Sequence, residues 1–117
     1  MAHRIDGRKL GRKTGPRRAL YANLIVSVLR YERVHTTEAR ASEVRGMVEH
    51  VITLAKGGTL AERRRIVAQL PDEPLVIDKL INDIAARYGD RSSGYTRLTK
   101  IGLRAGDRAP IVQLELV

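Results

Sequence analysis

The sequence predicts an α+β fold: four helices packed on a small mixed sheet, with a C-terminal β-hairpin and a basic N-terminal arm. Apolar residues recur at helical spacing between about residues 16 and 88, with breaks at glycine and proline. After Gly94 they alternate with polar residues, as in strands. The arm has too few apolar side chains to join a core. We therefore expect residues 1–15 to be a basic extension and residues 16–117 a single globular domain.

The first helix is predicted from about residue 16 to residue 32. Pro16 suits the first turn of a helix, where a missing N–H costs nothing. Apolar side chains then recur at helical spacing, at Leu20, Leu24 and Val28, with Tyr21, Ile25 and Leu29 beside them. The β-branched residues within 33–37 predict a short extended segment after this helix.

A second helix is predicted between this extended segment and the Gly57-Gly58 pair. Thr36 or Thr37 can cap its N-terminus, and glycine is the residue that most readily forms a left-handed C-terminal cap. Its buried stripe is predicted to contain Val44, Val48, Val51, Ile52 and Ala55.

Two further helices are predicted before residue 90. Thr59 and Glu62 have the spacing of a capping box, which starts a third helix that ends near Leu70. The fourth helix is expected to begin around Pro74 and to run to Tyr88. Its core face is predicted to contain Ile77, Leu80, Ile81, Ile84 and Tyr88.

The alternating pattern after Gly94 predicts two strands, at residues 95–101 and 111–117. They are joined by a long basic loop of turn-forming residues, 102–110. Val112, Leu114 and Leu116 are expected to face the helices, whereas Gln113 and Glu115 are expected to face solvent.

The net charge of +9 is concentrated at the two ends of the sequence. Residues 1–18 carry a net +6, residues 19–90 carry no net charge, and residues 91–117 carry a net +3. A balanced body with basic ends is typical of a module that binds a polyanion. Few aromatic side chains are present for stacking on bases, so shape and backbone recognition of folded RNA is favoured.

The candidate binding residues form two groups. The first group lies in the arm and at the start of the first helix: His3, Arg4, Arg8, Lys9, Arg12, Lys13, Arg17 and Arg18. The second lies in the C-terminal hairpin: Arg97, Lys100, Arg104 and Arg108. Each Arg or Lys can neutralise a phosphate and release its counterions. Alternation predicts that Arg97 and Lys100 point to opposite faces of their strand, which favours Arg104 and Arg108 as contacts. The run 63–65 (RRR) is a third basic segment, for which a solvated helix surface is favoured over a binding surface.

The sequence contains no pattern that is typical of an enzyme. Cysteine is absent, the three histidines lack metal-ligand spacing, and the glycines of the arm lack the spacing of a phosphate loop. We expect no catalytic residue, cofactor, metal or small-molecule substrate. No apolar run is long enough to span a bilayer, so no membrane partner is expected. An Arg-rich N-terminus also occurs in transit peptides, but the glycines and Pro16 make this one a poor amphipathic helix.

Several segments together resemble one protein family. They are 1–4 (MAHR), 7–10 (GRKL), 32–39 (ERVHTTEA), 54–56 (LAK), 86–88 (ARY), 94–98 (GYTRL), 104–110 (RAGDRAP) and 114–116 (LEL). In this order, and over nearly the whole chain, they resemble the bacterial large-subunit ribosomal protein L17 family.

The resemblance implies a structural protein of the cytoplasmic ribosome without catalytic activity. It also implies a compact α/β body near the peptide exit tunnel, in contact with large-subunit (23S) rRNA and neighbouring ribosomal proteins. The basic arm would then thread between rRNA helices, and the hairpin loop would be a second contact. Composition alone leaves two alternatives open, a general nucleic-acid-binding protein such as a nucleoid protein and a protein-interaction module.

Overall fold

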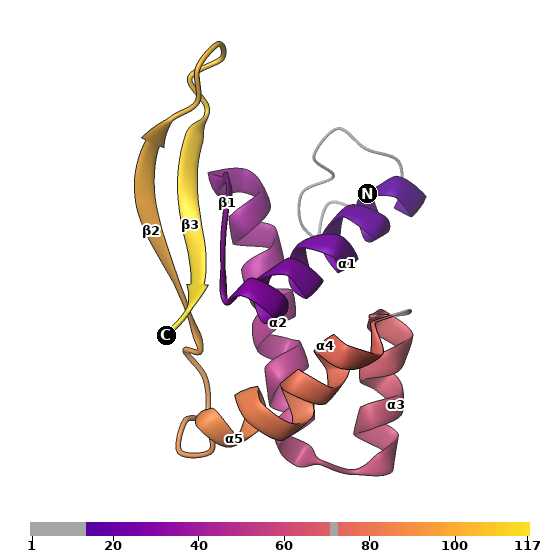
Figure 1. Cartoon of the computed structure of the whole chain (residues 1–117). Coiled ribbons are helices and arrows are strands. Elements are labelled where there is room, and N and C mark those ends of the chain that lie inside the picture. The colour runs from indigo at the N-terminus through magenta and orange to yellow at the C-terminus, as the bar shows by residue number, and fades with distance from the viewer. Residues whose placement is uncertain (1–13, 71–72) are drawn as a thin grey trace, which may run out of the picture.

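The computed structural model describes residues 14–70 and 73–117, and Figure 1 shows the order of their elements. The elements are α1 (Thr14–Tyr31), β1 (Arg33–Thr37), α2 (Glu38–Gly57), α3 (Leu60–Gln69), α4 (Pro74–Lys79), the π-helical segment η2 (Leu80–Ile84), α5 (Ala85–Arg87), β2 (Thr96–Leu103) and β3 (Pro110–Leu116). Because α4, η2 and α5 are continuous, they form one helical stretch. The predicted α+β class with four helical stretches and a C-terminal hairpin is confirmed.

The turn from α1 into β1 depends on Glu32, which has a positive φ of 65°. Its N–H donates to the carbonyl of Val28, and its own carbonyl accepts from the N–H of Leu116. The next cap is Thr37 rather than Thr36: the Thr37 hydroxyl accepts from the Arg40 N–H at 3.5 Å. Local capping chemistry therefore fixes where α2 begins.

The glycine pair between α2 and α3 acts as predicted. Gly58 has a φ of 70°, the left-handed conformation that ends a helix. Thr59 then caps α3 by accepting from the Glu62 N–H at 3.2 Å. The Glu62 carboxylate accepts from the Thr59 hydroxyl at 3.0 Å, so the two side chains bind each other, and that of Thr59 also binds the backbone.

The fourth predicted helix contains a one-turn irregularity. In η2 the N–H of Ala85 donates to the carbonyl of Leu80, five residues earlier, which widens the helix locally. Four members of the predicted core face are buried, and Ile81 is half-buried. The periodic apolar pattern predicts this burial but carries no signal for the wider turn.

The three strands form one sheet in the order β1-β3-β2, and both pairs are antiparallel. The sheet is therefore antiparallel within the described residues, which corrects the predicted mixed sheet. A bulge between Lys100 and Gly102 interrupts the β2–β3 register. On β3 the predicted alternation is confirmed, because Val112, Leu114 and Leu116 are buried and the residues between them are half-buried.

The core lies between this sheet and the helices. Figure 1 shows α1 and α2 against one face of the sheet, while α3 and the α4–α5 stretch pack at the end of α2 that lies away from the hairpin tip. All five residues predicted for the α2 stripe are buried. Tyr95, predicted as the first strand residue, is fully buried just before β2 and packs against Tyr88, with ring centroids 5.3 Å apart.

Candidate nucleic-acid interface

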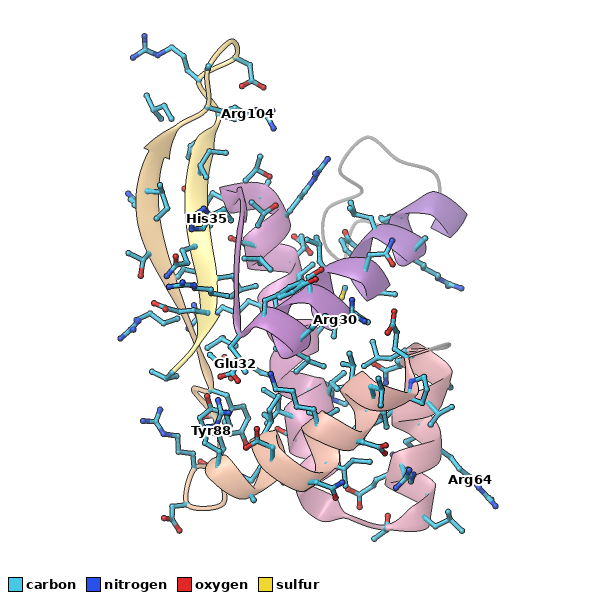
Figure 2. All side chains as sticks on the ribbon, in the orientation of Figure 1. Arg30, Glu32, His35, Arg64, Tyr88 and Arg104 are labelled. Carbon is cyan, nitrogen blue, oxygen red and sulfur yellow. The ribbon has the colours of Figure 1, made fainter. Side chains whose placement is uncertain are left out.

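The β2–β3 hairpin projects beyond the helices and carries Arg104 near its tip (Figures 1 and 2). The loop is held by two backbone hydrogen bonds, from the Arg104 N–H to the Ala109 carbonyl and from the Arg108 N–H to the Arg104 carbonyl. Gly106 and Arg108 have positive φ values of 98° and 58°. The loop is therefore a folded turn with a defined shape.

Arg104 forms a two-point ion pair with Asp107 inside this turn. Its Nε and Nη2 atoms donate to the two carboxylate oxygens at 3.1 and 2.5 Å. Arg104 lowers the pKa of Asp107 to about 2, and the N–H of Ala109 also donates to this carboxylate. The edge of the Arg104 guanidinium formed by Nε and Nη2 is therefore occupied by the Asp107 carboxylate.

Arg108 and Lys100 have no ion pair among the residues that the structure describes. Both are exposed, and Arg108 lies in the same turn as the Arg104–Asp107 pair. Their cationic groups therefore need no rearrangement to meet a phosphate. The sequence favoured Arg104 and Arg108 equally as RNA contacts, because the ion pair between Arg104 and Asp107 forms only in the folded loop.

Arg97 and Lys100 lie on opposite faces of the sheet, as their alternation predicts. Lys100 is opposite Val112, on the side that faces the helices, and its side chain is exposed. Arg97 is opposite Glu115 on the outer face, and its Nε donates to the Glu115 carboxylate at 3.0 Å. The structure therefore does not bring the hairpin cations onto one surface.

Arg17 and Arg18 lie in the N-terminal part of α1. Arg18 is exposed and Arg17 is half-buried, and the first turn of the helix contains no acidic residue. Positive charge at this end opposes the helix dipole, so a bound anion would relieve an unfavourable arrangement. The other predicted arm residues, His3, Arg4, Arg8, Lys9, Arg12 and Lys13, lie outside the described residues.

Several cations of the body are paired with carboxylates far away in the sequence. The centre of the largest group is Glu32, which binds Arg87 Nη1 at 2.5 Å and Lys79 Nζ at 3.1 Å. The hydrogen bond from Arg87 lowers the pKa of Glu32 to about 2. Figure 2 shows Glu32 between α1 and the end of the α4–α5 stretch. We call these three residues the Glu32 cluster.

Two more ion pairs connect α4 and its N-cap residue, Glu73, to other helices. Arg30 of α1 binds Glu73 at 2.5 Å, and Arg63 of α3 binds Asp78 at 3.5 Å. Sequence reasoning missed these pairs, because no local pattern links partners 43 or 15 residues apart. Arg64 and Arg65 of the same run are exposed, which fits the predicted solvated surface.

The described residues contain no group of three His, Asp or Glu side chains that could hold a metal ion. His50 is exposed on α2, and Ser92 and Ser93 are exposed between α5 and β2. Across residues 14–70 and 73–117, no helix has the length and apolar character needed to cross a bilayer.

Comparison with known proteins gives consistent matches. A family model described as ribosomal protein L17 matches residues 20–117. The chain is 47% identical over 117 residues to large ribosomal subunit protein bL17 of Dehalococcoides mccartyi, covering all of this chain and 99% of that protein. It is 54% identical over 110 residues to the bL17 of Caldanaerobacter subterraneus subsp. tengcongensis, covering 94% and 97% of the two chains. The bL17 of Desulfosudis oleivorans is 49% identical over 117 residues, which are 56% of that protein.

Proposed function

The chain belongs to the ribosomal protein L17 family, and we therefore propose that it is a structural, non-enzymatic constituent of the large ribosomal subunit. The observation that carries this proposal is the similarity over the whole chain to proteins named large ribosomal subunit protein bL17. The predicted membership of the family is confirmed.

Within the subunit, the chain binds folded 23S rRNA through phosphate contacts and stabilises it. Support comes from the charge distribution: the body from residue 19 to residue 90 is neutral, and the excess positive charge lies in the segments on either side. Phosphate contacts made by Arg and Lys release counterions, which makes such binding strong and salt-dependent. Few aromatic residues are available for base stacking, so the shape of the RNA dominates recognition.

The contacts come from two regions. The basic extension predicted over residues 1–15 binds rRNA phosphates, together with Arg17 and Arg18 in the N-terminal part of α1. In the hairpin, Arg108 and Lys100 contact phosphates directly, because neither has an ion pair within the described part of the chain. Arg104 serves mainly to shape the loop through Asp107, and it contacts RNA with the edge of its guanidinium that Asp107 leaves free.

The resemblance to its family supports a location for the chain in the ribosome. We place it near the peptide exit tunnel, beside other large-subunit proteins, in the ribosomes of the cytoplasm. Footprinting of rRNA in large subunits with and without the chain tests this position. Protected nucleotides around the tunnel exit are expected, and protection confined to another region contradicts the assignment.

The test of the main proposal is sucrose-gradient sedimentation of a cell extract, followed by a high-salt wash of the large subunit. One copy of the chain per washed subunit is expected, because many phosphate and protein contacts hold an integral component. Release of the chain into free or DNA-bound fractions would contradict the proposal and favour a general nucleic-acid-binding protein.

The contribution of the arm is tested by deleting residues 1–15. The deletion should weaken binding to deproteinised 23S rRNA and reduce the dependence of binding on salt, by about 0.7 to 0.9 in the log–log slope for each phosphate that the arm neutralises. An unchanged slope would contradict the role of the arm and leave the hairpin as the main contact.

A further inference from the structure

The outer face of the sheet, which is turned away from α1 and α2, carries two rows of polar side chains. In the antiparallel register, Glu115 on the central strand lies between Arg33 of β1 and Arg97 of β2. Residues directly opposite each other in such a sheet share a face. The opposite face carries the buried Val112 and Leu114.

The second row lies directly beside the first. Gln113 of the central strand lies between His35 of β1 and Thr99 of β2. We call the surface formed by Arg33, His35, Arg97, Thr99, Gln113 and Glu115 the sheet platform. Its residues come from the family-like segments 32–39, 94–98 and 114–116 and from positions next to them.

A chain of side-chain hydrogen bonds crosses all three strands of the platform. Arg97 Nε donates to Glu115 Oε1 at 3.0 Å, and Gln113 Nε2 donates to Glu115 Oε2 at 3.1 Å. Gln113 Oε1 lies 2.9 Å from His35 Nε2. Figure 2 shows His35 beside β3.

These bonds determine which groups donate hydrogen bonds and which accept them. A carboxylate only accepts hydrogen bonds, so the Gln113 amide must turn its NH2 group towards Glu115 and its carbonyl towards His35. His35 must then donate from Nε2, so Nδ1 of this exposed ring is an acceptor when the imidazole is neutral. A ribose 2′-hydroxyl can donate to such an acceptor, whereas DNA has no corresponding group.

The charges of the platform favour an anion. The Glu115 side chain is only 18% exposed, whereas that of Arg97 is 60% exposed. Arg97 uses its Nε for Glu115, so both terminal amino groups of its guanidinium remain for another acceptor. Arg33 is exposed and has no ion pair with any described residue. An approaching phosphate therefore meets cations first, with the carboxylate beneath them.

We propose that the sheet platform is a further RNA-binding surface, on which Arg33, Arg97 and His35 contact a ribose-phosphate backbone. Gln113 and Glu115 are positioning residues that orient Arg97 and His35. The proposal rests on the proposed function, because it requires that the chain binds rRNA. It extends the contact region from the hairpin tip along the outer face of β2 and β3.

The first test places a photoreactive phenylalanine analogue at Thr99, which is exposed on the platform, and irradiates intact large subunits. A crosslinked adduct that nuclease shortens is expected. A nuclease-resistant adduct with another protein, or no adduct, would overturn the proposal and identify the platform as a protein contact or a free surface. The matched control places the same analogue at Arg64, which Figure 2 shows pointing away from the body on α3.

The second test measures binding of the full chain to deproteinised 23S rRNA over a series of salt concentrations. We expect Arg33→Gln and Arg97→Gln each to weaken binding several-fold and to lower the salt slope by about 0.7 to 0.9, as removal of one phosphate-neutralising cation does. Arg65→Gln, an exposed change on α3, serves as the matched control. Circular dichroism verifies that each variant is folded.

The two tests separate this proposal from the proposed function. If the wild-type chain binds 23S rRNA and the two platform variants bind it as tightly as the wild type, the platform proposal fails and the proposed function stands. If the wild-type chain binds duplex DNA of equal length as well as it binds 23S rRNA and is absent from washed subunits, the proposed function itself fails.

Discussion

The Glu32 cluster allows a quantitative prediction of how much one residue contributes to the stability of the fold. Glu32→Gln keeps the size of the side chain and the positive φ of 65°, but removes the negative charge that binds Arg87 and Lys79. A fall in pKa from 4.5 to about 2 corresponds to about 3 kcal/mol if solvent does not screen the charges. The side chains of Glu32 and Arg87 are 37% and 33% exposed, and screening reduces the expected loss to about 1 kcal/mol.

The assay is thermal or urea unfolding of the wild type and the variant between pH 2 and pH 7. Because the pKa of Glu32 is lowered by folding, its stabilisation is fully present above about pH 4.5 and disappears as the pH falls towards 2. At pH 7 we expect the variant to melt about 4 °C lower. The difference between the two proteins should shrink through the acid range, because the carboxyl groups other than Asp83, which shares Arg87 with Glu32, keep the same surroundings in both.

The matched control is Asp90→Asn, which removes an exposed carboxylate that has no ion pair in the described part of the chain. This control should melt with the wild type at every pH. Equal stability of Glu32→Gln and wild type at pH 7, or a difference that persists at pH 2, would refute the assignment of the stabilisation to the ion pairs of Glu32.

Four further changes test other parts of the fold by urea unfolding. Gly58→Ala should destabilise the protein by about 1 kcal/mol, because Gly58 has a φ of 70°. Gly46→Ala, in open space within α2, should instead stabilise the protein by about 0.5 to 1 kcal/mol. A stability change of the same sign for both variants would contradict the conformational argument. Leu80→Ala should cost about 2 to 5 kcal/mol, because Leu80 is fully buried at the π-helical turn, and a loss below about 1 kcal/mol would mean that the site collapses around the cavity. Tyr88→Phe should cost about 1 kcal/mol, because the Tyr88 hydroxyl donates to the Val117 carbonyl at 2.6 Å; an unchanged midpoint would show that water replaces this bond without loss.

Features that depend on neighbouring residues could be predicted from the sequence. Thr59 and Gly58 are recognisable because capping is a property of a few consecutive residues. The alternation on β3 predicted which side chains meet the helices, since the period of a strand is fixed by its geometry. The same local rule predicted that Arg97 and Lys100 would separate onto two faces.

Features that depend on chain topology could not be predicted in the same way. The contact between Glu32 and Arg87 joins residues 55 positions apart, and no local pattern announces it. The order of the strands is not set by a local pattern either. β1 could have paired with either later strand, and its pairing with β3 places His35 beside Gln113. The sheet platform is a product of that pairing, which is why sequence reasoning identified Arg97 and missed Arg33 and His35.

The position of β3 between β1 and β2 determines when the sheet can fold during synthesis. Both outer strands are translated before β3, yet each pairs with β3 and not with the other. The helices can pack as they emerge, but no strand of this sheet has a partner until residues 110–116 have left the ribosome. A chain interrupted just before residue 110 would therefore carry two unpaired strands and expose the apolar side of its helices. Quality control would have to treat such a product as unfolded, although more than nine-tenths of the sequence has been made.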